Sequence, residues 1–159
     1  MPRLRRRFLA TSSGYLTEAT AILAATASEL GALHVALNRF WACVDQVAPR
    51  PLDTVWRLEL TTAIAEVGTN IILHAYPNGT GAAGCIGLRL RLYADRIEAR
   101  LIDQGVAYQP QAARSISHND LFALREGGFG LVIVRTAVDR LSYYRTPAGT
   151  NCWRLIKRF

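Results

Sequence analysis

Two groups of side chains in this sequence stand where they could act on a ligand. Glu66 and Asn70 lie four residues apart, with His74 a further turn along, in a segment otherwise rich in Ala, Val and Ile. On a helix this spacing puts them on one face. Asp103 and Gly105 follow an apolar segment, where a carboxylate can accept a hydrogen bond from an exocyclic amine and glycine lets the chain turn closely around a ligand. Each group also has an ordinary explanation: a polar stripe facing solvent, and a simple turn.

Clustered glycines and a Gly-Thr pair form two further motifs. Gly127, Gly128 and Gly130 stand where a helix is expected to begin, and free N–H groups at a helix N-terminus attract an anion such as phosphate. Their spacing is neither that of a Walker loop nor that of a dinucleotide-binding fingerprint. Thr150 follows Gly149 at the entry to the last expected strand, where a hydroxyl could help hold a base. Each motif is ambiguous alone, but their order along the chain is not.

In that order the motifs resemble those of the GHKL ATPases, the superfamily of gyrase, Hsp90, histidine-kinase and MutL nucleotide domains. Within it the sequence is most similar to the bacterial anti-sigma factor serine kinases of partner-switching pathways. The resemblance covers roughly residues 18–158 and rests on Glu66-Val67-Gly68-Thr69-Asn70 with His74-Ala75-Tyr76, Asp103-Gln104-Gly105 with Tyr108 and Pro110, Glu126-Gly127-Gly128-Phe129-Gly130-Leu131, and Gly149-Thr150-Asn151 with Leu155 and Lys157-Arg158. The sequence departs from the family at Ala107, where relatives often carry Pro or Gly, and has few matching residues between Gly105 and Gly127.

The resemblance implies that the protein binds ATP and Mg²⁺. It assigns Glu66 as general base, Asn70 as the Mg²⁺ ligand, Asp103 and Thr150 to the adenine side with the turn at Gly105, and Gly127, Gly128 and Gly130 to the phosphates. Glu66 would take the proton of a serine hydroxyl while the metal neutralises charge on the γ-phosphate. His74 is expected to pack at the end of its helix rather than to act as a ligand.

The function implied is that of an ATP-dependent protein serine/threonine kinase that phosphorylates a STAS-type anti-sigma antagonist. By the same resemblance it would bind and inhibit a sigma factor, and a homodimer is one expected assembly. Two alternatives remain open. One is an ATP-binding module that sequesters a partner without phosphotransfer, which the presence of Glu66 disfavours. The other is a histidine-kinase catalytic domain, which needs a two-helix dimerisation segment where only about 27 residues precede the first helix here.

These motifs need elements that bring them together. Hydrophobic periodicity and capping residues predict a strand at 18–27, a helix at 28–44 capped by Ser28, a helix at 54–75 capped by Asp53, strands at 86–92 and 96–103, a long connection at 104–127 with a short helix near 120–125, a helix at 130–139, and a hairpin of strands 141–146 and 150–157. We therefore expect an α+β fold, a two-layer sandwich in which helices cover one face of a mixed, mostly antiparallel sheet.

The net charge of +7 invites a nucleic-acid interpretation, but its distribution argues against one. Arg3 and the run 5–7 supply four charges, and the remaining 15 basic and 12 acidic residues differ by only three. We expect a basic leader over 1–17 and one ATP-binding domain over 18–159, with neither a nucleic-acid partner nor a membrane span, because no apolar run is long enough. The leader resembles a twin-arginine export signal, but Ser12 and Ser13 interrupt the apolar stretch that such a signal needs, and use of ATP favours the cytoplasm.

Overall fold

The computed structural model of the chain describes residues 14–76, 84–109 and 130–159. The described residues form five strands and three α-helices, with two short turns of 3₁₀- and π-helix. In chain order the elements are β1 (Thr17–Ala24), η1 (Ala27–Glu29), α1 (Leu30–Val47), α2 (Thr54–Asn70), the π-helical turn η2 (Ile71–Ala75), β2 (Cys85–Leu92), β3 (Arg96–Asp103), α3 (Gly130–Ala137), β4 (Arg140–Arg145) and β5 (Asn151–Arg158).

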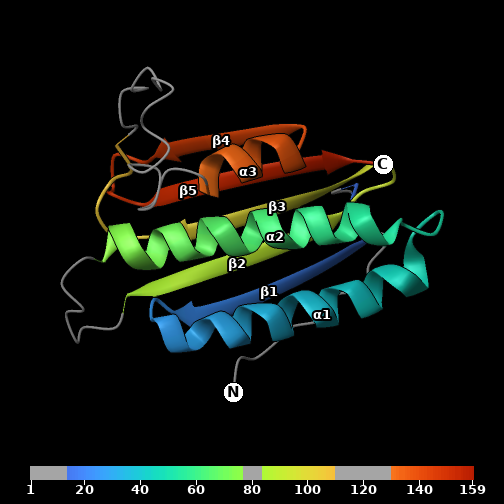
Figure 1. Cartoon of the computed structure of the whole chain (residues 1–159), viewed down its shortest axis with the longest axis horizontal. Helices are drawn as coiled ribbons and strands as arrows, with labels where there is room; N and C mark the ends of the chain where they lie inside the picture. Colours follow the sequence, from blue (N-terminus) through green and yellow to red (C-terminus); the bar gives the residue numbers. More distant parts are fainter. Residues whose placement is uncertain (1–13, 77–83, 110–129) are drawn as a thin grey trace, which may run out of the picture.

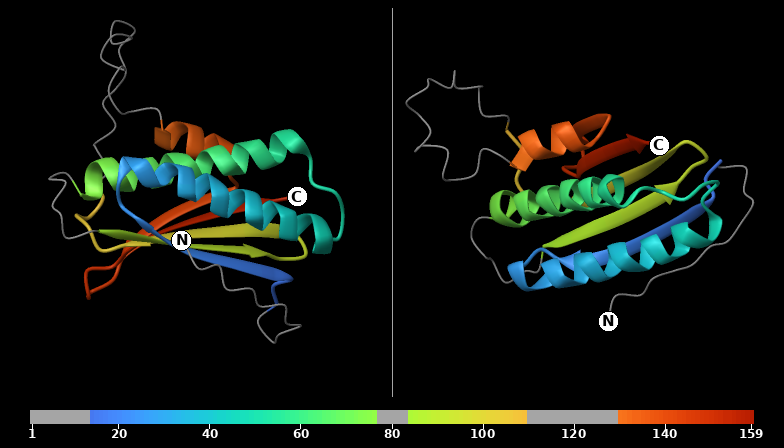
Figure 2. Two further views of the ribbon diagram at one scale, coloured as in Figure 1. Left: turned by 90° about the horizontal axis from the view of Figure 1, so that it is seen from below. Right: turned by 45° about the vertical axis from the view of Figure 1, so that its right-hand side comes forward.

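The strands form one sheet in the order β1-β2-β3-β5-β4. Every pairing between neighbouring described strands is antiparallel. All three α-helices lie on the same face of the sheet, with α2 between α1 and α3 (Figures 1 and 2). The expected α+β sandwich is confirmed, and its sheet has no parallel pair among these strands.

The core lies between the two layers. Alternate residues of the strands point toward the helices, as in β2, where Ile86, Leu88, Leu90 and Leu92 are buried. The buried residues on the helix side of the core are Leu60, Ile64 and Val67 of α2 and Leu33, Leu37 and Phe40 of α1. This packing holds α2 rigidly over the centre of the sheet, which matters because α2 carries Glu66 and Asn70.

Local details differ from the predictions in three places. Ser28 does not cap α1, because it lies inside the η1 turn and its hydroxyl pairs with the hydroxyl of Thr26. β1 ends at Ala24 rather than at residue 27. Ala24 pairs with Cys85, the first residue of β2, so the two strands stop pairing there. The second helix runs to residue 75 as expected, but its last turn is a π-helix. The Asp53 cap is confirmed, since its Oδ1 accepts from the N–H of Trp56 at 2.9 Å.

The other face of the sheet carries a buried carboxylate. Glu98 is only 3% exposed and accepts from Arg100, two positions along β3, and from Arg154 of β5. Burial alone would raise the pKa of Glu98, but hydrogen bonds from Arg154 and Arg100 lower it overall.

Among the described helices, none has the length and apolar character needed to cross a membrane.

Candidate nucleotide-binding site

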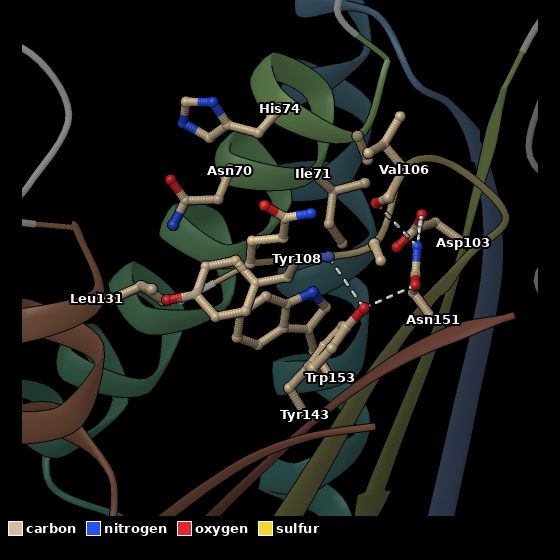
Figure 3. A pocket seen from close by; sticks show the side chains of 13 residues that line it. Asn70, Ile71, His74, Asp103, Val106, Tyr108, Leu131, Tyr143, Asn151 and Trp153 are labelled. Carbon is tan, nitrogen blue, oxygen red and sulfur yellow. Dashed lines mark hydrogen bonds between the residues drawn. The ribbon is translucent and has the colours of Figure 1, made fainter. Parts of the chain in front are cut away.

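A cavity of about 320 Å³ opens between the end of α2 and the sheet (Figure 3). This volume lies at the lower end of the range for small-molecule sites, about 300–1,000 Å³. Its walls come from segments far apart in the sequence: α2 and η2, the residues after β3, the start of α3, and strands β4 and β5. The lining residues are Asn70, Ile71, His74, Ala75, Asp103, Val106, Ala107, Tyr108, Gln109, Leu131, Tyr143, Asn151 and Trp153.

Asp103 is the most deeply placed charge in the cavity wall, with only 2% of its surface exposed. Its Oδ1 accepts from the N–H of Gly105 and from Nδ2 of Asn151, both at 2.8 Å. Its Oδ2 is buried and has no hydrogen-bond partner among the described residues. A buried acceptor without a donor costs free energy, because it has lost its hydrogen bonds to water. A ligand with an N–H or O–H group at this oxygen would supply the missing donor.

Asn151 stands directly opposite Asp103 in the β3–β5 register and is 1% exposed. Its Nδ2 also approaches the carbonyl oxygens of Gly105 and Val106, at 3.2 and 3.3 Å. Its Oδ1 accepts from the hydroxyl of Tyr143 at 2.8 Å and from Arg145 at 2.7 Å. One amide thus ties the β4–β5 hairpin to the segment that leaves β3.

Gly105 packs against the last turn of η2 without any space for a side chain. A Cβ at this position would lie 2.4 Å from the carbonyl oxygen of Ala75 and 2.7 Å from its Cβ. The next residue, Val106, donates its N–H to the same carbonyl at 2.9 Å. On the other side of the turn, the hydroxyl of Tyr76 accepts from the N–H of Gln104 at 3.2 Å. The Asp103 turn is therefore held against α2 through η2.

The opposite end of the site is formed where α3 begins. A Cβ on Gly130 would lie 2.7 Å from Oε2 of Glu66 and 3.5 Å from Nδ2 of Asn70, so both side chains face the first residue of α3. That Nδ2 atom is buried and has no partner among the described residues. The first N–H groups of a helix carry partial positive charge, which attracts anions. A carboxylate, a carboxamide and a helix N-terminus meet here.

Three aromatic rings form one wall of the cavity between these ends. The rings of Tyr108 and Tyr143 each have their centroid 4.8 Å from that of Trp153. The hydroxyl of Tyr143 accepts from the N–H of Tyr108 at 3.0 Å, which fixes the segment after β3 against β4 (Figure 3). The rings are tilted to one another by 51–74°, and an aromatic wall of this kind suits an aromatic ring in the ligand.

The predicted site residues are distributed as follows. Glu66, Asn70 and Gly130 come together at one end of the site, and Asp103 and Gly105 at the other. Thr150 lies in the β4–β5 turn, with its N–H on the hydroxyl of Thr146, and it is not among the residues that line the cavity. Gly127 and Gly128, together with the short helix predicted near 120–125, lie outside the described residues.

Of the thirteen residues that line the cavity, sequence reasoning assigned only Asn70 and Asp103 to the site, and two of the others are instructive. Asn151 stood next to Thr150 in the Gly-Thr-Asn motif, but nothing in the local pattern marked its side chain as the partner of Asp103. His74 lies at the end of its helix, as expected, but it does not pack there: it is exposed and lines the cavity. It stands on the π-helical turn, which only the structure reveals, and such turns are frequent at functional sites.

Known proteins are similar to this chain in sequence. A family model described as a histidine kinase-like ATPase domain matches residues 15–157. The chain is 36% identical over 88 residues to the serine-protein kinase RsbW of Halalkalibacterium halodurans, covering 52% of each chain. It is 33% identical over 93 residues to serine-protein kinase RsbW of Staphylococcus epidermidis, covering 55% of this chain and 58% of that one.

One solved structure shows the same fold. The RsbU and RsbW domains of Rv1364c from Mycobacterium tuberculosis match with a TM-score of 0.60 at 19% identity, over 89% of this chain and 31% of that chain. The match between the chain and the curated relatives spans about half the length of those relatives.

Proposed function

Because the chain belongs to the family of histidine kinase-like ATPase domains, we propose that it binds ATP and transfers the γ-phosphate to a serine or threonine hydroxyl of a partner protein. The observation that carries the proposal is a cavity with two chemically different ends. At one end Asp103 presents a buried, unpartnered acceptor, and at the other lies Asn70. Beside Asn70, Glu66, which does not itself line the cavity, faces the N-terminus of α3.

The end of the cavity at Asp103 fits a 6-amino purine. The free Oδ2 would accept from the exocyclic amine, and the ring would lie beside the aromatic wall of Tyr108 and Trp153. Gly105 keeps the turn close to the base, because its lack of a side chain lets the backbone press against Ala75.

The end at α3 fits the phosphates and a divalent cation. The N-terminus of α3 offers N–H groups to phosphate oxygens, and we propose that Gly127, Gly128 and Gly130 let the preceding chain follow them. The buried end of the Asn70 amide lacks a partner, and turning the amide by 180° would place Oδ1 there, a ligand type that Mg²⁺ accepts. When bound, Mg²⁺ would neutralise charge on the γ-phosphate.

We assign Glu66 as the general base, the group that accepts the proton of the serine hydroxyl. The serine oxygen attacks phosphorus, the bond between the γ-phosphorus and the bridging oxygen breaks, and ADP leaves with that oxygen. The hydroxyl proton passes to the Glu66 carboxylate, whose Oε2 faces the start of α3. Atoms and charge balance as ATP and serine going to ADP, phosphoserine and a proton.

For the partners we propose what the resemblance to anti-sigma factor serine kinases implies: a STAS-type anti-sigma antagonist as the phosphate acceptor and a sigma factor as the protein that is bound and inhibited. The name serine-protein kinase RsbW, which two relatives carry, supports the kinase part of this proposal. We place this activity in the cytoplasm, where ATP is available.

Transfer of labelled γ-phosphate from ATP to the STAS-domain proteins encoded near its gene tests the proposal. The wild type should label one of them on a serine or threonine, and Glu66→Gln should lower the rate by at least about 100-fold while it still binds ATP. Glu29→Gln makes the same chemical change just before α1 and should keep the wild-type rate.

The outcomes separate the alternatives. No transfer to any candidate together with tight ATP binding would point to a module that sequesters its partner without phosphotransfer. Equal transfer by the wild type and Glu66→Gln would rule out Glu66 as the base.

A further inference from the structure

We propose that Asn151 is a positioning residue that makes the site selective for a 6-amino purine, because it holds Asp103 so that a single carboxylate oxygen faces the ligand. This inference rests on the proposed ATP-binding function. It adds a residue from the β4–β5 hairpin that acts on the base through Asp103 and does not touch the base itself.

The orientation of the Asn151 amide is determined by its neighbours. Among the described residues, the hydrogen-bond partners of Nδ2 are all acceptors: the Asp103 carboxylate and two backbone carbonyl oxygens. Those of Oδ1 are donors: the Tyr143 hydroxyl, which gives its proton to this oxygen, and the Arg145 guanidinium. A flipped amide would set oxygen against a carboxylate and N–H against a guanidinium, so only one orientation is stable.

With both ends of its amide engaged, Asn151 has no polar group left for a ligand. Its effect therefore passes to Asp103, to which it donates at 2.8 Å in a fully buried contact. The N–H of Gly105 donates to the same Oδ1. Turning the carboxylate out of its plane would break both bonds at once. The two donors therefore fix that plane, so that one of the two equivalent oxygens is always satisfied and the other is left for a ligand.

The unsatisfied oxygen, Oδ2, then selects the ligand. It is buried, unpartnered among the described residues, and belongs to a residue that lines the cavity (Figure 3). A purine with an amine at position 6 supplies the missing donor. A purine without that amine leaves the carboxylate unpaired, and sites built to bond an N–H group discriminate strongly against analogues that lack it.

The test compares ATP with purine riboside 5′-triphosphate, which lacks only the 6-amine, by isothermal titration calorimetry in the presence of Mg²⁺. The wild type should bind ATP more tightly by roughly 10-fold or more, because the lost bond is to a charged group. Asn151→Ala should lose most of this discrimination. Asn38→Ala makes the same change at an exposed position on α1 and should keep all of it.

A merely structural role for Asn151 predicts a different result. A general loss of folding would weaken both nucleotides equally and leave their ratio unchanged. Positioning predicts a changed ratio, a raised KM for ATP, and a kcat at saturating ATP within a few-fold of the wild type, because Glu66 and Asn70 at the far end are untouched.

The controls separate this inference from the proposed function. Asp103→Ala should abolish the discrimination, and if it does not, the adenine contact itself is wrong. If Asp103→Ala abolishes it while Asn151→Ala keeps it, the positioning role is overturned and the ATP site stands. Should Asn151→Ala fail to fold, the double variant Tyr143→Phe/Arg145→Met decides, since it removes both donors that hold the amide: reduced discrimination supports the inference, and unchanged discrimination overturns it.

Discussion

Replacing Gly105 by alanine should destabilise the protein and weaken nucleotide binding together. The added Cβ would lie 2.4 Å from the carbonyl oxygen of Ala75, 2.7 Å from its Cβ and 2.9 Å from its carbonyl carbon. These are backbone or near-backbone atoms of η2, which cannot rotate away as a long side chain would. Gly105 does not have a positive φ, so the effect is steric and not conformational.

The expected cost follows from the contacts. Overpacking costs about 1–3 kcal/mol. Separating the two segments also breaks the bond from the N–H of Val106 to the Ala75 oxygen, now 2.9 Å, which is worth about 1 kcal/mol. Alanine leaves the unfolded chain less conformational entropy than glycine does, which offsets somewhat less than about 1 kcal/mol of this cost. A net loss of roughly 1–3 kcal/mol lowers the Tm of a chain of this size by about 2–12 °C.

Thermal unfolding followed by circular dichroism, with and without saturating ATP and Mg²⁺, measures both effects. ATP should raise the Tm of the wild type and raise that of Gly105→Ala less, because the turn that holds Asp103 has moved. Gly31→Ala is the matched control: a Cβ there meets no described atom within 4 Å, so alanine in α1 should stabilise by up to about 1 kcal/mol. A Gly105→Ala protein with the wild-type Tm would refute the close packing against η2, and equal losses in both variants would show a generic effect of removing glycine.

Three further changes probe other parts of the structure. Gly130→Ala would place a Cβ 2.7 Å from Oε2 of Glu66, so phosphotransfer should fall by about 10- to 100-fold without a lower Tm; an unchanged rate would count against the placement of this carboxylate. Glu98→Gln removes a carboxylate whose pKa is lowered in the fold, so wild type should be more stable by about 1–3 kcal/mol at pH 7, and urea unfolding should show the difference shrinking as the pH falls below about 4.5. A difference that stays constant down to pH 3 would contradict the ion pairing. Lys157→Met deprives the buried carbonyl of Ala137 of its donor and should cost about 1–3 kcal/mol in the same assay, whereas wild-type stability would show that this buried bond contributes nothing net.

The elements were largely predictable because their signals are local. The period-two alternation of β2 and the Asp53 cap of α2 depend on residues within a few positions of each other, and both appear in the fold. The end of β1 and the start of α1 were less predictable. β1 ends where its pairing with β2 ends, so a strand distant in the sequence decides that boundary. The start of α1 is shifted by a local turn, in which the hydroxyls of Thr26 and Ser28 pair, and the Ser28 cap expected from the residue type does not form.

For the site, the order of four motifs identified the residue types, but their roles at atomic level depend on contacts between distant segments. Asp103 was predicted as an acceptor; that only its Oδ2 remains free depends on Asn151, which lies 48 positions further along the chain. Thr150 was predicted from its motif, yet the β3–β5 register puts its neighbour Asn151 beside Asp103.

The amino-acid sequence by itself determined the α+β fold class, the family, and the positions of Glu66, Asn70 and Asp103, since helix spacing and strand alternation are properties of neighbouring residues. Only the tertiary structure decided what these groups face. The antiparallel register aligned Asn151 with Asp103, and the packing of α3 on α2 brought Gly130 against Glu66. Such contacts depend on how whole elements pack, because an atom's hydrogen-bond partners are set by its neighbours in space and not by those along the chain.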